Sequence, residues 1–476
     1  MIAPSFDSVH LALKNLLVIA FVFIINIPSH SQTDFVVIDS VIVIGLHKTK
    51  KIVVSQEIDL HSGDTISIDQ LASRLHINEK RIQSTGIFTL ASINVKDWNT
   101  DLNTCDIYIT VQENWYLYPH PIFELADRNF NVWRKEFNYS LSRVNYGLAI
   151  THTNFSGSKD KAKLKIQGGY VRKLELLYDL PYLHNKWGAS ANILYSENRE
   201  IAYNSIDNKP VFYHTDDKKK VYFVARSSIA VQRRSNAQFF QTMKLEYNYA
   251  KIDTMISREL NPSYFGLGRE KVHYFFLDYL AKYDNTIYPL YPMGGFKIEL
   301  NLRKEGLGIF NDVDNLWMTF HVEKHHPFFK NFIMSNKVRA KIQFLNNDLP
   351  YFLNNALGYS SNNITGYQLY VMDGRSYILS KNSLKYKVLD KNIKIFKFVP
   401  KHFKVMSTQL FVRGAFDIGY SDNPLFKAEN KLSNTWQYGY GPGLDLILFN
   451  TLTVSAEYGI TKFGEKGFFF SSGFNF

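Results

Sequence analysis

Two histidines and a glutamate occupy every second position of one short stretch. Of the candidate chemical sites in the sequence, this one most resembles a metal site. His321, Glu323 and His325 would share one face of a strand, because side chains two residues apart point the same way. Zinc binds such groups at about 2.0–2.2 Å. Same-face neighbours on a strand are about 6.6–7 Å apart, too wide for all three to reach one ion unaided. We therefore expect a solvated polar face, with metal binding as the alternative, and no cofactor.

The sequence has no spacing that is typical of nucleophilic catalysis. The G-x-S-x-G pattern of a nucleophile elbow is absent. The single cysteine, Cys105, cannot form an intramolecular disulfide, and a cysteine-based zinc site is not expected. The 14 histidines make an accidental pairing with Asp, Ser or Asn easy, so such a pair alone would indicate no hydrolase. We expect that the protein is not an enzyme.

Composition narrows the class of protein further. The chain has 476 residues, of which 45% are hydrophobic and 21% charged, and this excludes a disordered chain. The net charge of +12 would suit nucleic acid or anionic lipid. Basic residues are scattered, however, and the longest tract is Lys218–Lys220, so we expect no nucleic-acid partner. Aromatic residues reach 15%, and no apolar run after residue 27 approaches the roughly 18 residues of a spanning helix.

Residues 1–31 have the pattern of a secretory signal peptide. Lys14 supplies the positive charge, and an apolar run follows from Leu16 to Ile27. Small residues at Ser29 and Ser31 predict cleavage after Ser31. The alternative is an uncleaved anchor, although the run is shorter than the ~20 residues of a membrane span. We expect the mature chain to work outside the cytoplasm.

Residues 33–115 predict a small α/β domain. A strand rich in β-branched residues runs from Phe35 to Gly45. Thr49 and Ser67 are candidate caps of two helices. Two strands are expected after these helices, at residues 90–95 and 105–111. The expected order of elements is therefore β-α-α-β-β.

Residues 116–476 predict a mainly β fold, a transmembrane β-barrel of about 16 strands. Segments of roughly ten residues alternate apolar and polar side chains, as in strands between lipid and a wet lumen. In 295–303 the apolar residues all fall on one face, while Lys, Glu, Asn and Arg fall on the other. A Lys or Arg on the lipid face would cost about 2–4 kcal/mol at mid-membrane. The aromatic excess suits interfacial girdles, which a soluble sandwich, the alternative, does not explain.

The N-terminal segments "VIVIGLHKTK", "EIDLHSGD", "STGIF…INV" and "IYITVQE" resemble those of a POTRA (polypeptide-transport-associated) domain. The resemblance implies a periplasmic domain that recruits extended polypeptides by β-augmentation. Such pairing needs an exposed strand edge with unpaired N–H and C=O groups, and our candidate edge is Ala91–Lys96. The alternative is a spacer that touches no substrate.

The remaining segments resemble the BamA/TamA superfamily, also called the bacterial surface antigen family. They are "NYGLAITHTNFSGS", "YDLPYL", "NNITGYQLYVMDG" and "VRGAFDIGY", in the family's order. The last strand places Phe470, Phe474 and Phe476 on one face and resembles, in part, the C-terminal sorting signal of barrel clients. The resemblance implies three domains: a signal peptide (1–31), a periplasmic POTRA-like domain (33–115) and an outer-membrane barrel (116–476).

The family's sixth loop folds into the lumen, and its tip carries an arginine. Here the tip is Ile364, Thr365, Gly366 and Tyr367, so Thr365 replaces that arginine. The resemblance implies that the family's arginine pairs with an aspartate and a glutamate on neighbouring strands. In this chain the aspartate is Asp417, and Lys385 stands at the position of the glutamate. Because the two changes keep one cation, we expect Lys385, or else Arg375, to contact Asp417. The alternative is that this loop lock has been lost.

The resemblance implies an insertase or translocase that assembles or transports polypeptides at the bacterial outer membrane. Its partners would be outer-membrane lipid, unfolded clients and accessory lipoproteins. The first barrel strand, expected around Ile122–Asn129, would template an incoming strand at a weak seam with the last strand. Pro119 and Pro121 cannot donate ladder hydrogen bonds and would weaken that seam. The rival is a channel, receptor or surface antigen barrel that has lost insertase activity.

Overall fold

The structure, a computed structural model, divides into two compact units. It describes residues 35–127, 129–184, 186–215, 220–236, 238–287, 291–310, 312–345, 349–359, 362–394, 405–425, 429–449 and 452–474. The predicted signal peptide lies outside these ranges. The first unit holds Leu60–His76, Asn94–Tyr108 and the chain up to Ile42, and the second holds Val43–Asp59, Ile77–Ile93 and Ile109–Phe476. Within the described ranges, no helix combines the length and apolar character that a membrane crossing requires.

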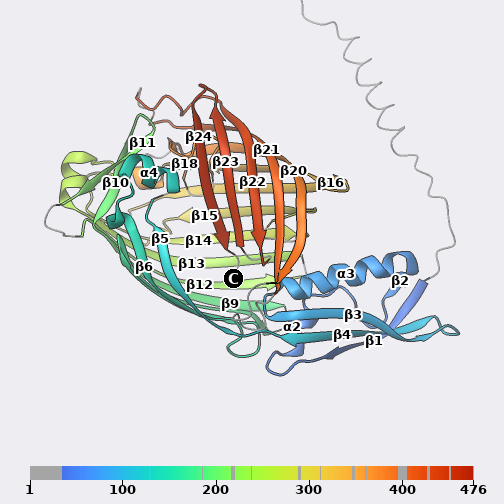
Figure 1. Cartoon of the computed structure of the whole chain (residues 1–476). Coiled ribbons are helices and arrows are strands. Elements are labelled where there is room, and N and C mark those ends of the chain that lie inside the picture. The colour runs from blue at the N-terminus through green and yellow to red at the C-terminus, as the bar shows by residue number, and fades with distance from the viewer. Residues whose placement is uncertain are drawn as a thin grey trace, which may run out of the picture. The chain divides into compact units, whose positions relative to one another are not determined.

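The N-terminal elements form a four-stranded sheet of order β2-β1-β4-β3 with two helices (Figure 1). The elements are β1 Phe35–Ile44, α2 Lys51–Ser55, β2 Thr65–Ser67, α3 Ile68–Ser84, β3 Phe88–Asn99 and β4 Thr104–Glu113. Strand β3 lies at one end of this order, so the predicted edge Ala91–Lys96 is confirmed as an edge. The single thiol, Cys105, is buried in β4.

The sequence analysis missed strand β2 and misplaced the N-cap of α2 by one residue. Ser67 ends β2, which pairs with the start of β1, and it directly precedes Ile68, the first residue of α3. Lys50 is the N-cap of α2, because Thr49 is occupied elsewhere. The Thr49 N–H donates to Glu113 at 2.7 Å, and its hydroxyl bonds Tyr116 at 3.1 Å.

In the part of the chain after Tyr116 that the structure describes, sixteen strands form one antiparallel sheet, which confirms the predicted barrel-type fold (Figure 1). The sheet runs from β24 through successive neighbours to β5. The strands are β5 Leu117–Leu125, β6 Val144–His152, β7 Lys161–Gly169, β8 Val171–His184, β9 Trp187–Asn198, β12 Tyr222–Arg234, β13 Phe239–Ile252, β14 Lys271–Asp284, β15 Gly295–Glu305, β16 Asn315–Phe329, β17 Phe332–Gln343, β20 Ser376–Lys394, β21 Val405–Asp422, β22 Gln437–Leu448, β23 Leu452–Thr461 and β24 Lys466–Phe474.

Smaller elements lie in the connections between these strands. Helix α4 spans Phe130–Phe137, between β5 and β6. Two hairpins lie outside the large sheet, β10 Glu200–Ile206 with β11 Lys209–His214, and β18 Asn355–Leu357 with β19 Met372–Asp373. Short helical turns complete the connections at η1 Leu141–Arg143, η2 Ile256–Leu260 and η3 Tyr351–Leu353.

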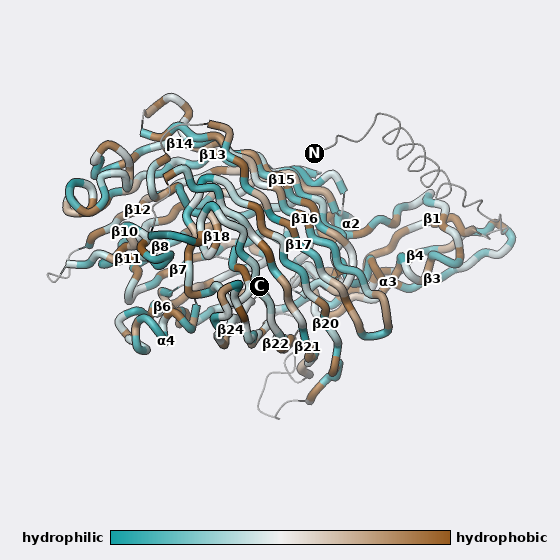
Figure 2. Tube along the Cα trace, turned by 90° about the horizontal axis from the view of Figure 1, so that it is seen from above, coloured by the Kyte–Doolittle hydropathy of each residue, from teal (hydrophilic) through white to brown (hydrophobic). Residues whose placement is uncertain are grey.

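Hydrophobic and hydrophilic residues alternate along the strands of the large sheet (Figure 2). On β15, the side chains of Phe296, Ile298, Leu300 and Leu302 are exposed. The charged residues between them form ion pairs with neighbouring strands, such as Arg303 with Asp278 at 2.9 Å. The predicted alternation is therefore confirmed, with an apolar face exposed and the ion pairs on the other.

A buried carboxylate ties the segment after α2 to barrel strands within the second unit. Glu57 pairs with Arg234 of β12 through two contacts of 2.6 Å and with Lys159 at 3.2 Å. Its carboxylate also accepts the hydroxyl of Tyr182 in β8 at 2.7 Å. Burial alone raises the pKa of Glu57, but Lys159, Arg234 and Tyr182 outweigh it and lower the pKa from 4.5 to about 2. A shielded bidentate pair of this kind is a strong anchor.

Replacing Glu57 with glutamine should destabilise the protein by about 3–5 kcal/mol, because Arg234 stays buried without its counter-ion. Since the folded pKa is lowered, the stabilisation by Glu57 is complete above about pH 4.5 and is lost as the pH falls towards 2. Thermal unfolding of the full chain in detergent at pH 6 and pH 3 measures both effects. Glu124→Gln, which removes an exposed pair with Lys165, is the matched control and should change little. Equal melting of Glu57→Gln and the wild type at pH 6 would contradict the anchor.

Candidate functional site

The first and last strands of the large sheet each leave one edge without a partner. Strands β24 and β5 stand at the two ends of the strand order, and among the described residues no ladder joins them. An edge of this kind presents a row of unpaired N–H and C=O groups to any chain that approaches. We name this pair of edges the seam.

The free edge of β5 lacks two hydrogen-bond donors. The carbonyl oxygen of Tyr116 accepts from Thr153 on the β6 side at 2.9 Å. Because backbone groups alternate between the two edges of a strand, Pro119 and Pro121, three and five residues later, face the seam. Proline has no N–H. The prolines therefore leave the β5–β6 ladder intact and remove donors from the seam, as the sequence suggested.

The free edge of β24 keeps its donors and acceptors. Thr461 of β23 donates to the carbonyl oxygen of Glu465, so odd-numbered residues of β24 face β23. Phe468 therefore presents its backbone groups to the seam. Its carbonyl oxygen accepts a hydrogen bond from the side chain of Asn131, which lies in α4. A side chain of α4 thus occupies a position where a paired strand would bind.

Helix α4 was missed by the sequence analysis, and the predicted first strand, Ile122–Asn129, is confirmed only as far as Leu125. Strand β5 ends at Leu125, whereas Asn129 is the N-cap of α4 and accepts the Val132 N–H at 3.0 Å. An Asn three residues before a helical N–H is a capping signal that could have been recognised. The ring of Phe130 packs edge-on against Phe470 of β24, with centroids 6.1 Å apart. Helix α4 therefore covers part of the free edge of β24.

The predicted C-terminal sorting strand is β24 itself. Phe470 is exposed and contacts α4. Phe474 is the last residue of β24, and Phe476 lies outside the described residues.

The tip of the long loop before β20 is buried and bound to the wall of the barrel. Thr365 donates to the Asp417 carboxylate through both its N–H, at 3.0 Å, and its hydroxyl, at 2.9 Å. The hydroxyl of Tyr367 donates to Gln437 at 3.0 Å and accepts from the Lys462 N–H. The loop is therefore held at its tip although the arginine is absent.

The cation that faces Asp417 is Lys381, at 3.4 Å, and the predicted contact with Lys385 or Arg375 is wrong. The register of β20 against β21 places Lys381 directly opposite Asp417, with Lys385 four residues further along β20. Arg375 pairs instead with Asp422 at 2.8 Å. The compensating cation exists, but it lies four residues, or two repeats of the strand pleat, before the expected residue.

Lys385 belongs to a second buried cluster. Its ammonium group lies 4.0 Å from the ring centre of Tyr291. The Tyr291 hydroxyl donates to Asp445 at 2.6 Å, and Arg413 bridges Asp445 and Glu457 at 3.0 and 2.9 Å. Lys385 is thus held over an aromatic ring beside an ion-pair network.

Glu457 connects this network to the loop and to α4. The side chain of Gln368, next to the loop tip, donates to Glu457 at 2.8 Å. The Gln368 carbonyl oxygen accepts from Asn129, the N-cap of α4, at 2.5 Å. The loop in the lumen and the helix at the seam therefore share one chain of hydrogen bonds.

The alternating histidines form part of the polar wall of β16. The carboxylate of Glu323 lies 2.9 Å from His321, 3.2 Å from His325 and 2.8 Å from Lys337. Glu299 pairs with His321 from the neighbouring strand at 3.0 Å. Among the residues that the structure describes, no group of three or more His, Cys, Asp or Glu could hold a metal ion.

The loop tip rests directly on glycine backbones. A Cβ atom at Gly439 of β22 would lie 1.8 Å from the Thr365 carbonyl oxygen, and one at Gly459 of β23 would lie 2.5 Å from the Gly366 nitrogen. Gly366 itself has a φ of +87°, which favours glycine. These glycines let the loop approach the wall more closely than any other residue would allow.

Comparisons with known proteins agree with this architecture. Residues 36–114 match the POTRA family, described as "Surface antigen variable number repeat". BamA from Haemophilus ducreyi lacking POTRA domains 1–3 is 14% identical, with a TM-score of 0.50 over 92% of this chain and 84% of that chain. CdiB from Escherichia coli is 9% identical, with a TM-score of 0.56 over 92% of this chain and 76% of that chain. A search of the curated proteins gave no match. The expected combination of a POTRA domain and a BamA-like barrel is confirmed as a fold.

Gly439→Ala should displace the loop tip, because the added Cβ would overlap the Thr365 carbonyl oxygen. We expect the loop 358–373 to become a site of limited proteolysis and the melting temperature to fall. Gly414→Ala on the adjacent strand β21 is the control, since a Cβ there meets no atom within 4 Å. A loop equally resistant to protease in both variants would show that the tip is not seated against Gly439.

Proposed function

Because this chain joins a POTRA domain to a BamA-like barrel fold, we propose that it is an outer-membrane protein that inserts or transports polypeptides. The observation that carries the proposal is the seam, where the described residues of β5 and β24 share no ladder. An extended client segment can pair with such an edge by β-augmentation. In this proposal the POTRA domain lies in the periplasm and offers a second edge, β3, to the same client. Accessory lipoproteins would be further partners.

The two edges of the seam are unequal, and we propose β24 as the one that binds a client strand. Strand β24 directs the backbone of Phe468, Phe470 and Ser472 to the seam with every N–H present. Strand β5 presents Pro119 and Pro121 there, which offer none. A client would thus form more hydrogen bonds with β24 than with β5, contrary to the expectation that the first strand is the template.

Helix α4 would be displaced when a client binds. It holds β24 through the hydrogen bond of Asn131 and the ring contact of Phe130. A hydrogen bond contributes about 0.5–1.5 kcal/mol net, and an aromatic pair a similar amount, so this contact can open and close. A backbone N–H of the paired client would replace the Asn131 side chain as the donor to the Phe468 carbonyl oxygen.

A specific observation also favours a second candidate, a passive barrel with no insertase activity. The loop tip is buried and bound to Asp417 and Gln437, and the chain of hydrogen bonds through Gln368 secures α4 over the seam. A barrel closed in this way could serve as a receptor or surface antigen.

Reconstitution in liposomes distinguishes the two candidates. We expect an unfolded barrel client to insert several times faster into liposomes that hold the protein than into empty ones. In a Cys105→Ser background, Phe130→Cys and Phe470→Cys joined by a short reducible crosslinker should return insertion to the empty-liposome rate. Reducing the crosslinker should restore it. A wild type that gives no acceleration supports the passive barrel, and a crosslinked protein that stays active contradicts opening at α4.

A further inference from the structure

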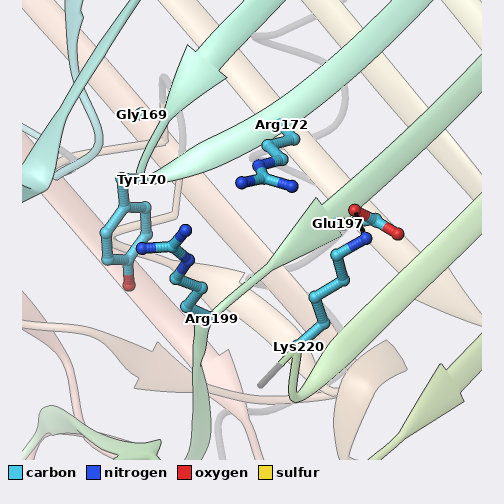
Figure 3. Close-up of a pocket in the computed structure, with 6 residues that line it drawn as sticks. All are labelled: Gly169, Tyr170, Arg172, Glu197, Arg199 and Lys220. Atoms are coloured by element: carbon cyan, nitrogen blue, oxygen red, sulfur yellow. Dashed lines mark ion pairs between the residues drawn. The ribbon is translucent and has the colours of Figure 1, made fainter. Parts of the chain in front are cut away.

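A cationic pocket lies at the outer rim of the barrel, which we define as the end where β7 and β9 finish and β8 and β12 begin. The turn between β7 and β8, the end of β9 and the residue before β12 meet there (Figure 3). The pocket is lined by Gly169, Tyr170, Arg172, Glu197, Arg199 and Lys220. Under the proposed function the chain enters the barrel from the periplasm at the start of β5, so this rim faces the external leaflet.

The charges of the pocket do not cancel. Three cationic side chains surround a single carboxylate, which leaves a net charge of 3 − 1 = +2. That carboxylate, Glu197, is held by Lys220 and by the hydroxyl of Tyr195. Arg172 is the ladder partner of Glu197, and Figure 3 shows its guanidinium group and that of Arg199 beside the same space. The arginines are exposed, and two such groups suit an anion with several oxygens, because each guanidinium can bind two of them.

The pocket continues into the exposed apolar face of the barrel. Leu174 and Leu176 of β8 have the same parity as Arg172, so they lie on its face of the sheet. Their exposed fractions are 45% and 48%. On β9, Ile193 shares a face with Glu197 and is 60% exposed. A ligand bound to the cations would therefore lie directly above a surface that suits hydrocarbon chains.

A row of aromatic rings marks the boundary between these two surfaces. Tyr195 packs on Phe223 with ring centres 5.2 Å apart, and Phe223 packs on Tyr249 at 5.5 Å. Aromatic side chains of membrane barrels gather at the level of the lipid headgroups. Because Tyr195 bonds Glu197, the row places the pocket at headgroup depth.

We propose that this pocket binds the phosphorylated headgroup of an outer-leaflet glycolipid, with its acyl chains along β8 and β9. The proposal rests on the proposed placement of the barrel in the outer membrane. The cations supply the phosphate contacts, and the exposed leucines and isoleucine supply the chain contacts. Neither a free phosphate nor a neutral glycolipid uses both halves of this surface.

Binding of defined lipids to the full-length protein in detergent tests the proposal. The probes are bis-phosphorylated lipid A, the same lipid without its phosphates, and inorganic phosphate, and native mass spectrometry measures the bound fraction. We expect the phosphorylated lipid to bind at least tenfold more tightly than the dephosphorylated one. Arg172→Gln with Arg199→Gln should remove this preference, whereas Arg233→Gln with Arg258→Gln, which removes two cations elsewhere, should keep it.

Three outcomes would overturn the proposal. The first is equal affinity for both lipids, and the second is an unchanged preference in the variant that lacks Arg172 and Arg199. The third is displacement of the lipid by inorganic phosphate at a concentration equal to that of the lipid. If the Gln variant does not fold, Arg172→Lys with Arg199→Lys keeps the charge and loses the two-oxygen contact, and it should bind several-fold more weakly. Lipid binding and client insertion are measured separately. If the protein inserts clients but does not prefer the phosphorylated lipid, only the proposed lipid site is refuted. If it prefers the phosphorylated lipid but does not insert clients, only the insertase function is refuted.

Discussion

The rest of the structure depends on one constraint, the unpaired backbone at the seam between β5 and β24. In a membrane, N–H and C=O groups that find no partner cost several kcal/mol each. In the membrane location that we propose, the chain would reduce this cost in two ways. Pro119 and Pro121 remove donors from the β5 edge, and Asn131 satisfies an acceptor on the β24 edge. The seam is therefore tolerable when closed but keeps groups on β24 that another strand can use.

The interior of the barrel supports this arrangement through a loop whose tip is fastened by a threonine and not by an arginine. Thr365 provides two donors to Asp417, and the positive charge comes from Lys381 on the adjacent strand rather than from the loop. The close fit requires glycine at positions 439 and 459. Since Gln368 bonds both Glu457 and the cap of α4, a movement of the loop would also affect the seam.

Periodic features of the sequence predicted the fold, and features set by register or by distant contacts did not follow from it. Alternation of apolar and polar residues predicted the mainly β barrel and its strand number, because a two-residue period is local. The β3 edge was predicted from the resemblance to a POTRA domain. The choice of Lys385 failed because strand register decides which residue faces Asp417, and register is not written in a local pattern. Helix α4 was missed because eight residues rarely form a helix without tertiary contacts, here with Phe470 and Phe468.

Amide hydrogen exchange along β24, resolved residue by residue in the detergent-solubilised full chain, tests the unpaired edge most directly. If β24 has a free edge, the amides of Phe470 and Ser472 exchange at least about tenfold faster than those of Phe469 and Ser471, which face β23. Protection that alternates from residue to residue is the result that the structure predicts. Uniform protection along β24, equal to that of a strand paired on both sides such as β13, would contradict it.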